Sequence, residues 1–127
     1  MIAVDTSALM AIMLDEAQAD ACIGALETEQ ELLISAASVV ESLIVSARRN
    51  VGDEMGRSID GLGFEVVSVT MASARRVAKV YETWGNGIDP AGLNRGDCYA
   101  YEVAKEHGCR LLFVGDDFSK TDIEGVI

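Results

Sequence analysis

The segment MIAVDTSALMAIML, residues 1–14, indicates the fold class of this chain. Its apolar start ends at the lone carboxylate of Asp5, and the hydroxyl residues Thr6 and Ser7 follow as candidate caps for a helix over residues 8–14. A short apolar run without alternation is typical of a strand that is buried on both faces. We therefore expect Asp5 at the carboxyl end of an interior strand, which is where open α/β sheets bind ligands.

The rest of the chain alternates short apolar runs with longer helical stretches. Further strands are predicted over residues 32–35, 64–69 and 111–114, and helices over residues 15–28, 38–50, 53–63, 71–84 and 94–108. Strands separated by helices indicate a mainly parallel sheet that is covered by helices on both faces. No linker or repeat divides the sequence, so we expect one domain over residues 1–127.

Cysteine and histidine content argues against several kinds of site. The three cysteines, Cys22, Cys98 and Cys109, do not have the spacing of a zinc site, and we expect reduced, buried thiols. His107 is the only histidine, and its place near a helix end suggests a structural role. No apolar run is long enough to span a membrane and no signal peptide is recognisable, so we expect a cytoplasmic protein without a membrane partner.

The formal net charge of −11 limits the ways in which the chain could bind nucleic acid. A protein that coats nucleic acid is usually basic, because neutralising phosphates drives binding. Either the chain does not bind nucleic acid, or its acids serve another purpose while a few arginines meet phosphates.

Four acids are predicted to meet at one edge of the sheet. Asp5 and Asp116 follow strands, whereas Glu41 and Asp97 lie in the first turn of predicted helices, and parallel strands place all these positions at the same edge. Each acid also has a purely structural explanation. Ser38 and Glu41 fit a capping box, Asn94 and Asp97 a weaker one, and Asp116 with Asp117 could form a turn.

A converging set of acids would need counter-ions. Two carboxylates about 5 Å apart repel by roughly 3 kcal/mol at an effective dielectric constant of about 20. Hard divalent cations such as Mg²⁺ or Mn²⁺ are the usual partners of oxygen ligands. A metal bound by several acids suggests phosphodiester chemistry, in which the metal activates water and stabilises the leaving oxygen.

Four segments of the chain, taken together, resemble the PIN-domain ribonucleases, specifically VapC-type toxins of bacterial toxin–antitoxin pairs. They are VDTSAL at residues 4–9, SAASVVE at 35–41, PAGLNRGDCYAY at 90–101, and LLFVGDDF at 111–118 with TDI at 121–123. They occur in the expected order and spacing and extend over nearly the whole chain.

The resemblance implies a PIN-like three-layer α/β/α fold, with a mainly parallel sheet of four or five strands. It also implies an acidic pocket for Mg²⁺ or Mn²⁺, in which catalytic and metal-binding roles fall to Asp5, Glu41, Asp97 and Asp116. Asp117 is the reserve candidate for the fourth acid. Thr6 or Ser7 would orient Asp5 or a water molecule through a hydroxyl. Arg95 is the best-placed of five arginines that could contact RNA phosphate, the others being Arg48, Arg49, Arg75 and Arg76.

The activity implied is metal-dependent hydrolysis of RNA by an endoribonuclease toxin that a cognate antitoxin inhibits. Such toxins usually form homodimers, and the apolar helices over residues 8–14 and 39–47 offer surfaces for both contacts. One alternative is a catalytically silent domain that binds a protein partner. A Mg²⁺-dependent phosphatase fits less well, because Ser7 stands where the second Asp of its Asp-x-Asp motif is needed. A phosphoacceptor receiver domain fits poorly too, because the acid pair and the lysine that it requires are missing.

Overall fold

Four short strands form one parallel sheet, in the order β3–β2–β1–β4. The computed structural model describes all residues from 1 to 127. The strands are β1 (Ile2–Val4), β2 (Leu32–Ser35), β3 (Glu65–Val67) and β4 (Arg110–Leu112). The predicted parallel sheet and its four strands are thus confirmed, although β3 and β4 are shorter than expected.

Six α-helices and one 3₁₀ helix connect and cover the strands. They are α1 (Thr6–Met13), α2 (Ala19–Thr28), α3 (Ala36–Arg48), α4 (Gly52–Gly61), α5 (Met71–Trp84), α6 (Arg95–Glu106) and η1 (Phe118–Lys120). The prediction of a helix from residue 15 was wrong, because Asp15 has a positive φ of 51° that ends the helical path before α2 begins. None of the helices combines the length and apolar character needed to cross a membrane.

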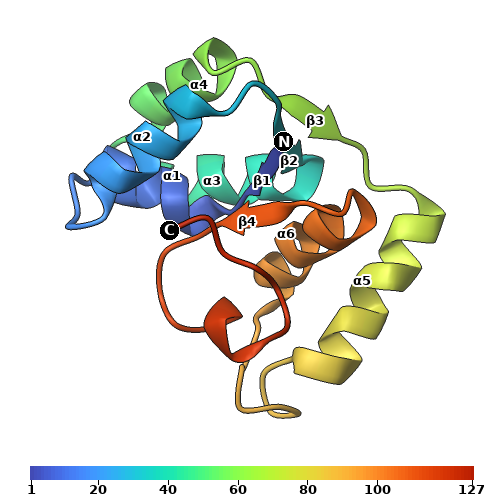
Figure 1. Cartoon of the computed structure of the whole chain (residues 1–127). Coiled ribbons are helices and arrows are strands. Elements are labelled where there is room, and N and C mark those ends of the chain that lie inside the picture. The colour runs from blue at the N-terminus through green and yellow to red at the C-terminus, as the bar shows by residue number, and fades with distance from the viewer.

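Alternate residues of the interior strands point into two separate cores. Ile2 and Val4 belong to a core shared with α1, α2 and α4, whereas Ala3 and Leu33 belong to a second core shared with α5 and α6. Figure 1 shows these two helix groups on opposite sides of the sheet. This is the predicted three-layer α/β/α arrangement, with each face of the sheet covered by helices.

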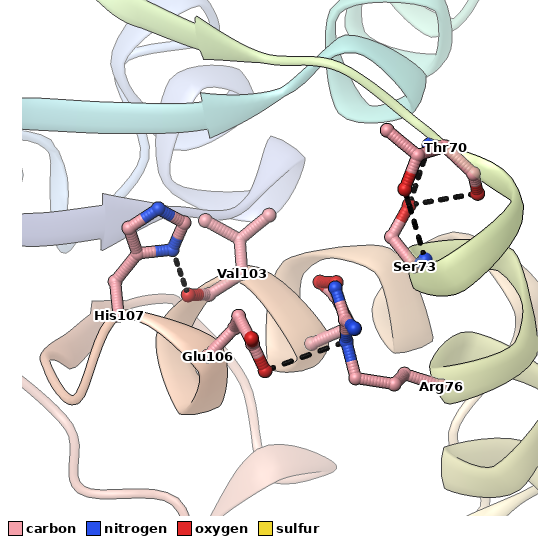
Figure 2. Close-up of polar contacts among 7 residues, drawn as sticks. Thr70, Ser73, Arg76, Val103, Glu106 and His107 are labelled. Carbon is pink, nitrogen blue, oxygen red and sulfur yellow. Dashed lines mark hydrogen bonds and ion pairs between the residues drawn. The ribbon is translucent and has the colours of Figure 1, made fainter.

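The helices α5 and α6 are joined by an ion-pair network around Arg76. The carboxylate of Glu102 is buried, with 5% of the residue exposed, and accepts hydrogen bonds of 3.2 and 3.3 Å from the Arg76 guanidinium. Arg76 also pairs with Glu106 at 3.4 Å (Figure 2). The charge of Arg76 is therefore already paired within the fold, which makes it a weaker candidate for a phosphate contact than Arg95.

The ends of α5 and α6 have local caps that the sequence partly predicted. The Thr70 side chain accepts a hydrogen bond from the Ser73 amide, and the Ser73 hydroxyl accepts one from the Thr70 amide (Figure 2). At the end of α6, a His107 ring nitrogen lies 2.9 Å from the Val103 carbonyl oxygen. His107 thus has the structural contact that its position at a helix end suggested.

A C-terminal segment pairs with the outer edge of β4. The amide of Leu111 donates to the carbonyl of Glu124, and the amide of Val126 donates to the carbonyl of Leu111, at 2.9 and 3.1 Å. The segment therefore covers the edge of the sheet that β4 would otherwise leave open.

Candidate active site

Asp5 lies at the carboxyl end of β1 and is itself the N-cap of α1. Its Oδ2 atom accepts a hydrogen bond of 3.0 Å from the amide of Ser7. The expectation that Thr6 or Ser7 caps this helix was wrong, because the helix already begins at Thr6. Only 2% of Asp5 is exposed, and its Oδ1 atom is buried without any hydrogen-bond partner. A buried carboxylate oxygen without a partner is costly, which points to a missing proton or cation.

Burial strongly favours the neutral form of Asp5. Loss of solvent raises the pKa of Asp5 to about 7, even though hydrogen bonding by Ser7 acts in the opposite direction. The charges of Asp97 and Glu41 raise the pKa of Asp5 further. The charges of Asp97 and Glu41 therefore act on Asp5, and the convergence of the acids on one metal ion stays a prediction.

Asp97 occupies the third position of α6 and forms a reciprocal capping box with Asn94. The Asp97 amide donates to Asn94 Oδ1 at 2.8 Å, and the Asn94 amide donates to Asp97 Oδ2 at 3.0 Å. The structural explanation of Asp97 is thus confirmed, but it leaves the second carboxylate oxygen free. Burial and then the charges of Asp117 and Glu41 raise the pKa of Asp97 to about 6. Asp97 can therefore cap α6 through Oδ2 and still have its other carboxylate oxygen free for a second function.

Glu41 has no capping role. The helix α3 begins at Ala36, and the side chain of Ser35 accepts a hydrogen bond of 3.2 Å from the Ala37 amide. The alternative of a capping box between Ser38 and Glu41 is therefore wrong, and Glu41 lies in the second turn rather than the first. The carboxylate of Glu41 makes no hydrogen bond or ion pair within the chain.

The Glu41 side chain extends from α3 to the first turn of α6, where it rests against Gly96. A Cβ atom built on Gly96 would lie only 2.0 Å from Glu41 Oε2. The carboxylate therefore occupies space that any other residue at position 96 would fill. Sequence reasoning missed Gly96, because a glycine in a helix gives no sign of a residue 55 positions earlier that packs on it.

Asp116 and Asp117 are both exposed, between β4 and η1. The charge of Asp117 is among the causes that raise the pKa of Asp97, whereas that of Asp116 is not. This favours Asp117 as the acid nearer to Asp97. The assignment of the fourth role to Asp116 stays a prediction.

The hydroxyls of Thr6 and Ser7 both bind the surrounding fold. Thr6 Oγ1 donates to the Ser38 carbonyl at 3.3 Å and accepts from Ser42 at 3.1 Å, which fixes α1 against α3. Ser7 Oγ accepts a hydrogen bond of 3.0 Å from the Val114 amide, so it joins the start of α1 to the segment after β4. Ser7 also contacts Asp5 directly, and this makes it the better candidate for orienting that acid.

These acids fit a hard divalent cation in their chemistry. No three of them already surround a common point closely enough to hold an ion. The partnerless Oδ1 of Asp5 and the free Glu41 carboxylate nonetheless offer oxygen atoms that no group of the chain engages. Oxygen ligands of this kind suit Mg²⁺ and Mn²⁺.

Arg95 is the cation beside this site. It lies two residues before Asp97, is exposed and forms no ion pair. Its guanidinium is free to meet an anionic ligand, which agrees with the predicted contact to phosphate.

A comparison with protein families and curated sequences places these motifs in a known group. The model of the PIN domain matches residues 2–124. Ribonuclease VapC30 of Mycobacterium tuberculosis is 39% identical over 127 residues, covering 97% of this chain and 96% of the relative. Both matches extend over nearly the whole chain, and the range matched by the PIN-domain model contains every acid discussed above.

Solved structures show the same fold at much lower sequence identity. Mycobacterium tuberculosis VapC20, described as a sarcin-ricin loop cleaving toxin, aligns with a TM-score of 0.80 at 16% identity, over 97% of this chain and 96% of that chain. A toxin-antitoxin complex from Klebsiella pneumoniae contains a chain with a TM-score of 0.75 at 15% identity, over 100% of this chain and 97% of that chain.

Proposed function

The chain belongs to the PIN-domain family, and we propose that it is a VapC-type ribonuclease toxin that hydrolyses RNA phosphodiester bonds with Mg²⁺ or Mn²⁺. Curated relatives named as ribonucleases support the activity. The observation that carries the metal dependence is the buried Oδ1 of Asp5, which has no partner and lies near two further acids.

Asp5, Glu41 and Asp97 are the residues that would hold the cation, with Asp116 or Asp117 as a fourth acid. A divalent cation bound there supplies activation of the attacking water and neutralises charge on the leaving oxygen. The N-cap hydrogen bond from Ser7 fixes the Asp5 carboxylate. Arg95 would bind a phosphate of the RNA. None of these side chains needs to act as a nucleophile.

Substitution of Asp97 by asparagine tests the assignment. Asparagine keeps an oxygen that can accept the Asn94 amide, so the cap survives while the charge is lost. We expect the variant to remain folded, to bind Mg²⁺ or Mn²⁺ more weakly in calorimetry and to lose cleavage of an RNA panel. Asp53→Asn is the matched control, since Asp53 is a first-turn acid of α4, at the other end of α3 from the site. Equal cleavage by Asp97→Asn and the wild type would refute the assignment.

Two alternative functions make different predictions in the same assays. A catalytically silent domain that binds a protein partner would bind neither metal ion measurably. A Mg²⁺-dependent phosphatase would bind metal but hydrolyse phosphate monoesters rather than RNA. Metal binding together with internal cleavage of RNA supports the endoribonuclease over both.

A cognate antitoxin and a second copy of the chain are the protein partners in this proposal. The toxin-antitoxin complex among the structural neighbours supports the antitoxin, and we place the toxin in the cytoplasm, where its RNA substrate is. The exposed apolar residues Val40, Leu43 and Ile44 of α3, which are 41–56% exposed, support a homodimer. Light scattering that reports a monomer at high protein concentration would remove the homodimer from the proposal.

A further inference from the structure

A groove between α5 and α6 begins at the helical turn that carries Asp97. Its volume is about 640 Å³, which lies within the range of small-ligand sites. Small and apolar side chains, including Val77 and Cys98, line part of it, and Tyr81, Asn86, Arg95 and Tyr99 supply its polar groups. We call this hollow the α5–α6 groove.

The charge of the α5–α6 groove suits an anionic ligand. None of its lining residues is acidic, although the chain has 21 acids among 127 residues. The hollow on the other side of the same two helices has three acids, Glu102, Glu106 and Asp122, and three cations, Arg76, Lys79 and Lys105. Arg95 is the one charged residue of the α5–α6 groove and has no ion-pair partner. An unpaired cation without a neighbouring acid in its lining favours an anion in the α5–α6 groove.

Tyr81 provides a fixed aromatic ring within the α5–α6 groove. Its hydroxyl donates to the carbonyl of Asn86 at 3.2 Å. Its ring also rests against Gly85, where an added Cβ would lie 2.8 Å from the Tyr81 Cγ atom. The residue is nevertheless 37% exposed. A ring that is held in place yet accessible is suited to stacking on a flat ligand.

Polar groups that lack partners within the chain surround this ring. The side-chain amide of Asn86 and the hydroxyl of Tyr99 form no hydrogen bond with other residues, so both are free to bind a ligand. An amide group can donate and accept at once, which matches the edge of a nucleobase. Stacking rings and amides together are typical of sites for unpaired bases.

The α5–α6 groove borders a hollow that contains one of the candidate metal-binding acids. Arg95 and Tyr99 line both the α5–α6 groove and the hollow that contains Glu41 and Gly96. We propose that this groove binds the nucleotide next to the cleaved phosphate, with its base on the ring of Tyr81 and its phosphate at Arg95. The inference rests on the proposed function and adds a substrate-binding subsite to it.

Binding of a short single-stranded RNA to the Asp97→Asn protein tests the subsite without cleavage. In fluorescence anisotropy with Mg²⁺ present, we expect Tyr81→Ala in this background to lower RNA affinity by about 5- to 150-fold, as expected when one stacked base is lost. Tyr81→Phe keeps the ring and should bind nearly as the parent does. Asn86→Ala provides a second variant that leaves the ring in place, and it should also weaken binding. Thermal unfolding measured by circular dichroism checks that each variant is folded.

A set of RNAs, each lacking one base at a different position, identifies the base that occupies the α5–α6 groove. At the position that occupies the α5–α6 groove, removing the base should weaken binding to the parent but not weaken binding to Tyr81→Ala any further. The proposal would be overturned if, at every position, removing the base lowered the RNA affinity of Tyr81→Ala as much as that of the parent. It would also be overturned by unchanged RNA affinity of Tyr81→Ala, or by a change from dimer to monomer in that variant without loss of RNA affinity, which would assign the groove to a second copy.

The two proposals can fail separately. If the wild type cleaves RNA and the base-removal experiment shows no coupling with Tyr81, only the subsite is wrong. If the coupling is present but no divalent cation supports cleavage by the wild type, the subsite stands and the proposed chemistry is wrong.

Discussion

Replacing Gly96 with alanine should weaken binding of Mg²⁺ or Mn²⁺ without unfolding the protein. The added Cβ would lie 2.0 Å from Glu41 Oε2, and ordinary contact begins near 3.4 Å, so the oxygen must retreat by about 1.4 Å. The Glu41 carboxylate is the flexible end of a half-buried side chain, so it can move away at little cost to the fold. A retreat of that size is more than half of a Mg²⁺–oxygen bond of about 2.1 Å, so Glu41 would no longer serve as a ligand in its present position.

The expected loss of metal affinity is about 10- to 100-fold, the usual cost of disturbing a group that orients a metal ligand. Calorimetric titration with Mn²⁺ measures the affinity, and thermal unfolding without metal measures the fold. The melting temperature should stay the same or rise, because alanine favours a helix over glycine by about 0.5–1 kcal/mol.

Gly24→Ala is the matched control for this substitution. Gly24 lies within α2, and a Cβ there would meet nothing within 4 Å. The control should show the helical gain in stability and normal metal binding. Unchanged metal affinity in Gly96→Ala, at a melting temperature at or above that of the wild type, would refute the role assigned to the contact between Gly96 and Glu41.

Three further perturbations have expected outcomes. Burial raises the pKa of Asp5 from 3.8 to about 7, so between these pH values the folded state holds a proton that the unfolded state has lost. The Asp5 contribution to metal-free stability should therefore fall by up to about 4 kcal/mol as pH rises from 4 to 7. Asp5→Asn should reduce the slope in denaturant titrations and leave the part that comes from Asp97, whose pKa is raised to about 6. An equal slope in both proteins would contradict this. Arg95→Ala should weaken RNA binding and reduce the dependence of log affinity on log salt concentration by about one; an unchanged slope would exclude the phosphate contact. Arg76→Ala leaves the buried Glu102 carboxylate without its main partner and should lower the free energy of unfolding by about 1–3 kcal/mol in urea titrations, with a smaller loss in Arg75→Ala.

The sequence predicted the architecture because its signals are local. The apolar run before Asp5 identifies an interior strand, and Asn94 identifies the start of α6, so both acids could be placed at the sheet edge. Parallel strands and the helices that follow them leave little choice about which ends meet. The predicted meeting of the acids around one ion stays a prediction, because no three of them lie close enough to hold it.

The details that the sequence could not supply depend on contacts between distant residues. The start of α3 was misplaced because Ser35 ends a strand and caps a helix at once, while the pair Ser38 and Glu41 matched a familiar capping pattern. The pairing of Arg76 with Glu102 and the packing of Glu41 on Gly96 join different helices, so no spacing along the chain reveals them. The α5–α6 groove likewise exists only once the two helices have packed together.

Pairing of the C-terminal segment with β4 has a practical consequence for producing the protein. Backbone hydrogen bonds from Leu111 to Glu124 and from Val126 to Leu111 pair residues 124–126 with the edge of β4. Ile127, which follows them, is 49% exposed. A purification tag joined after Ile127 leaves those bonds intact. Deletion from Glu124 onward would instead expose the edge of β4 and invite association of strands between copies, which the intact chain restricts to the β3 edge.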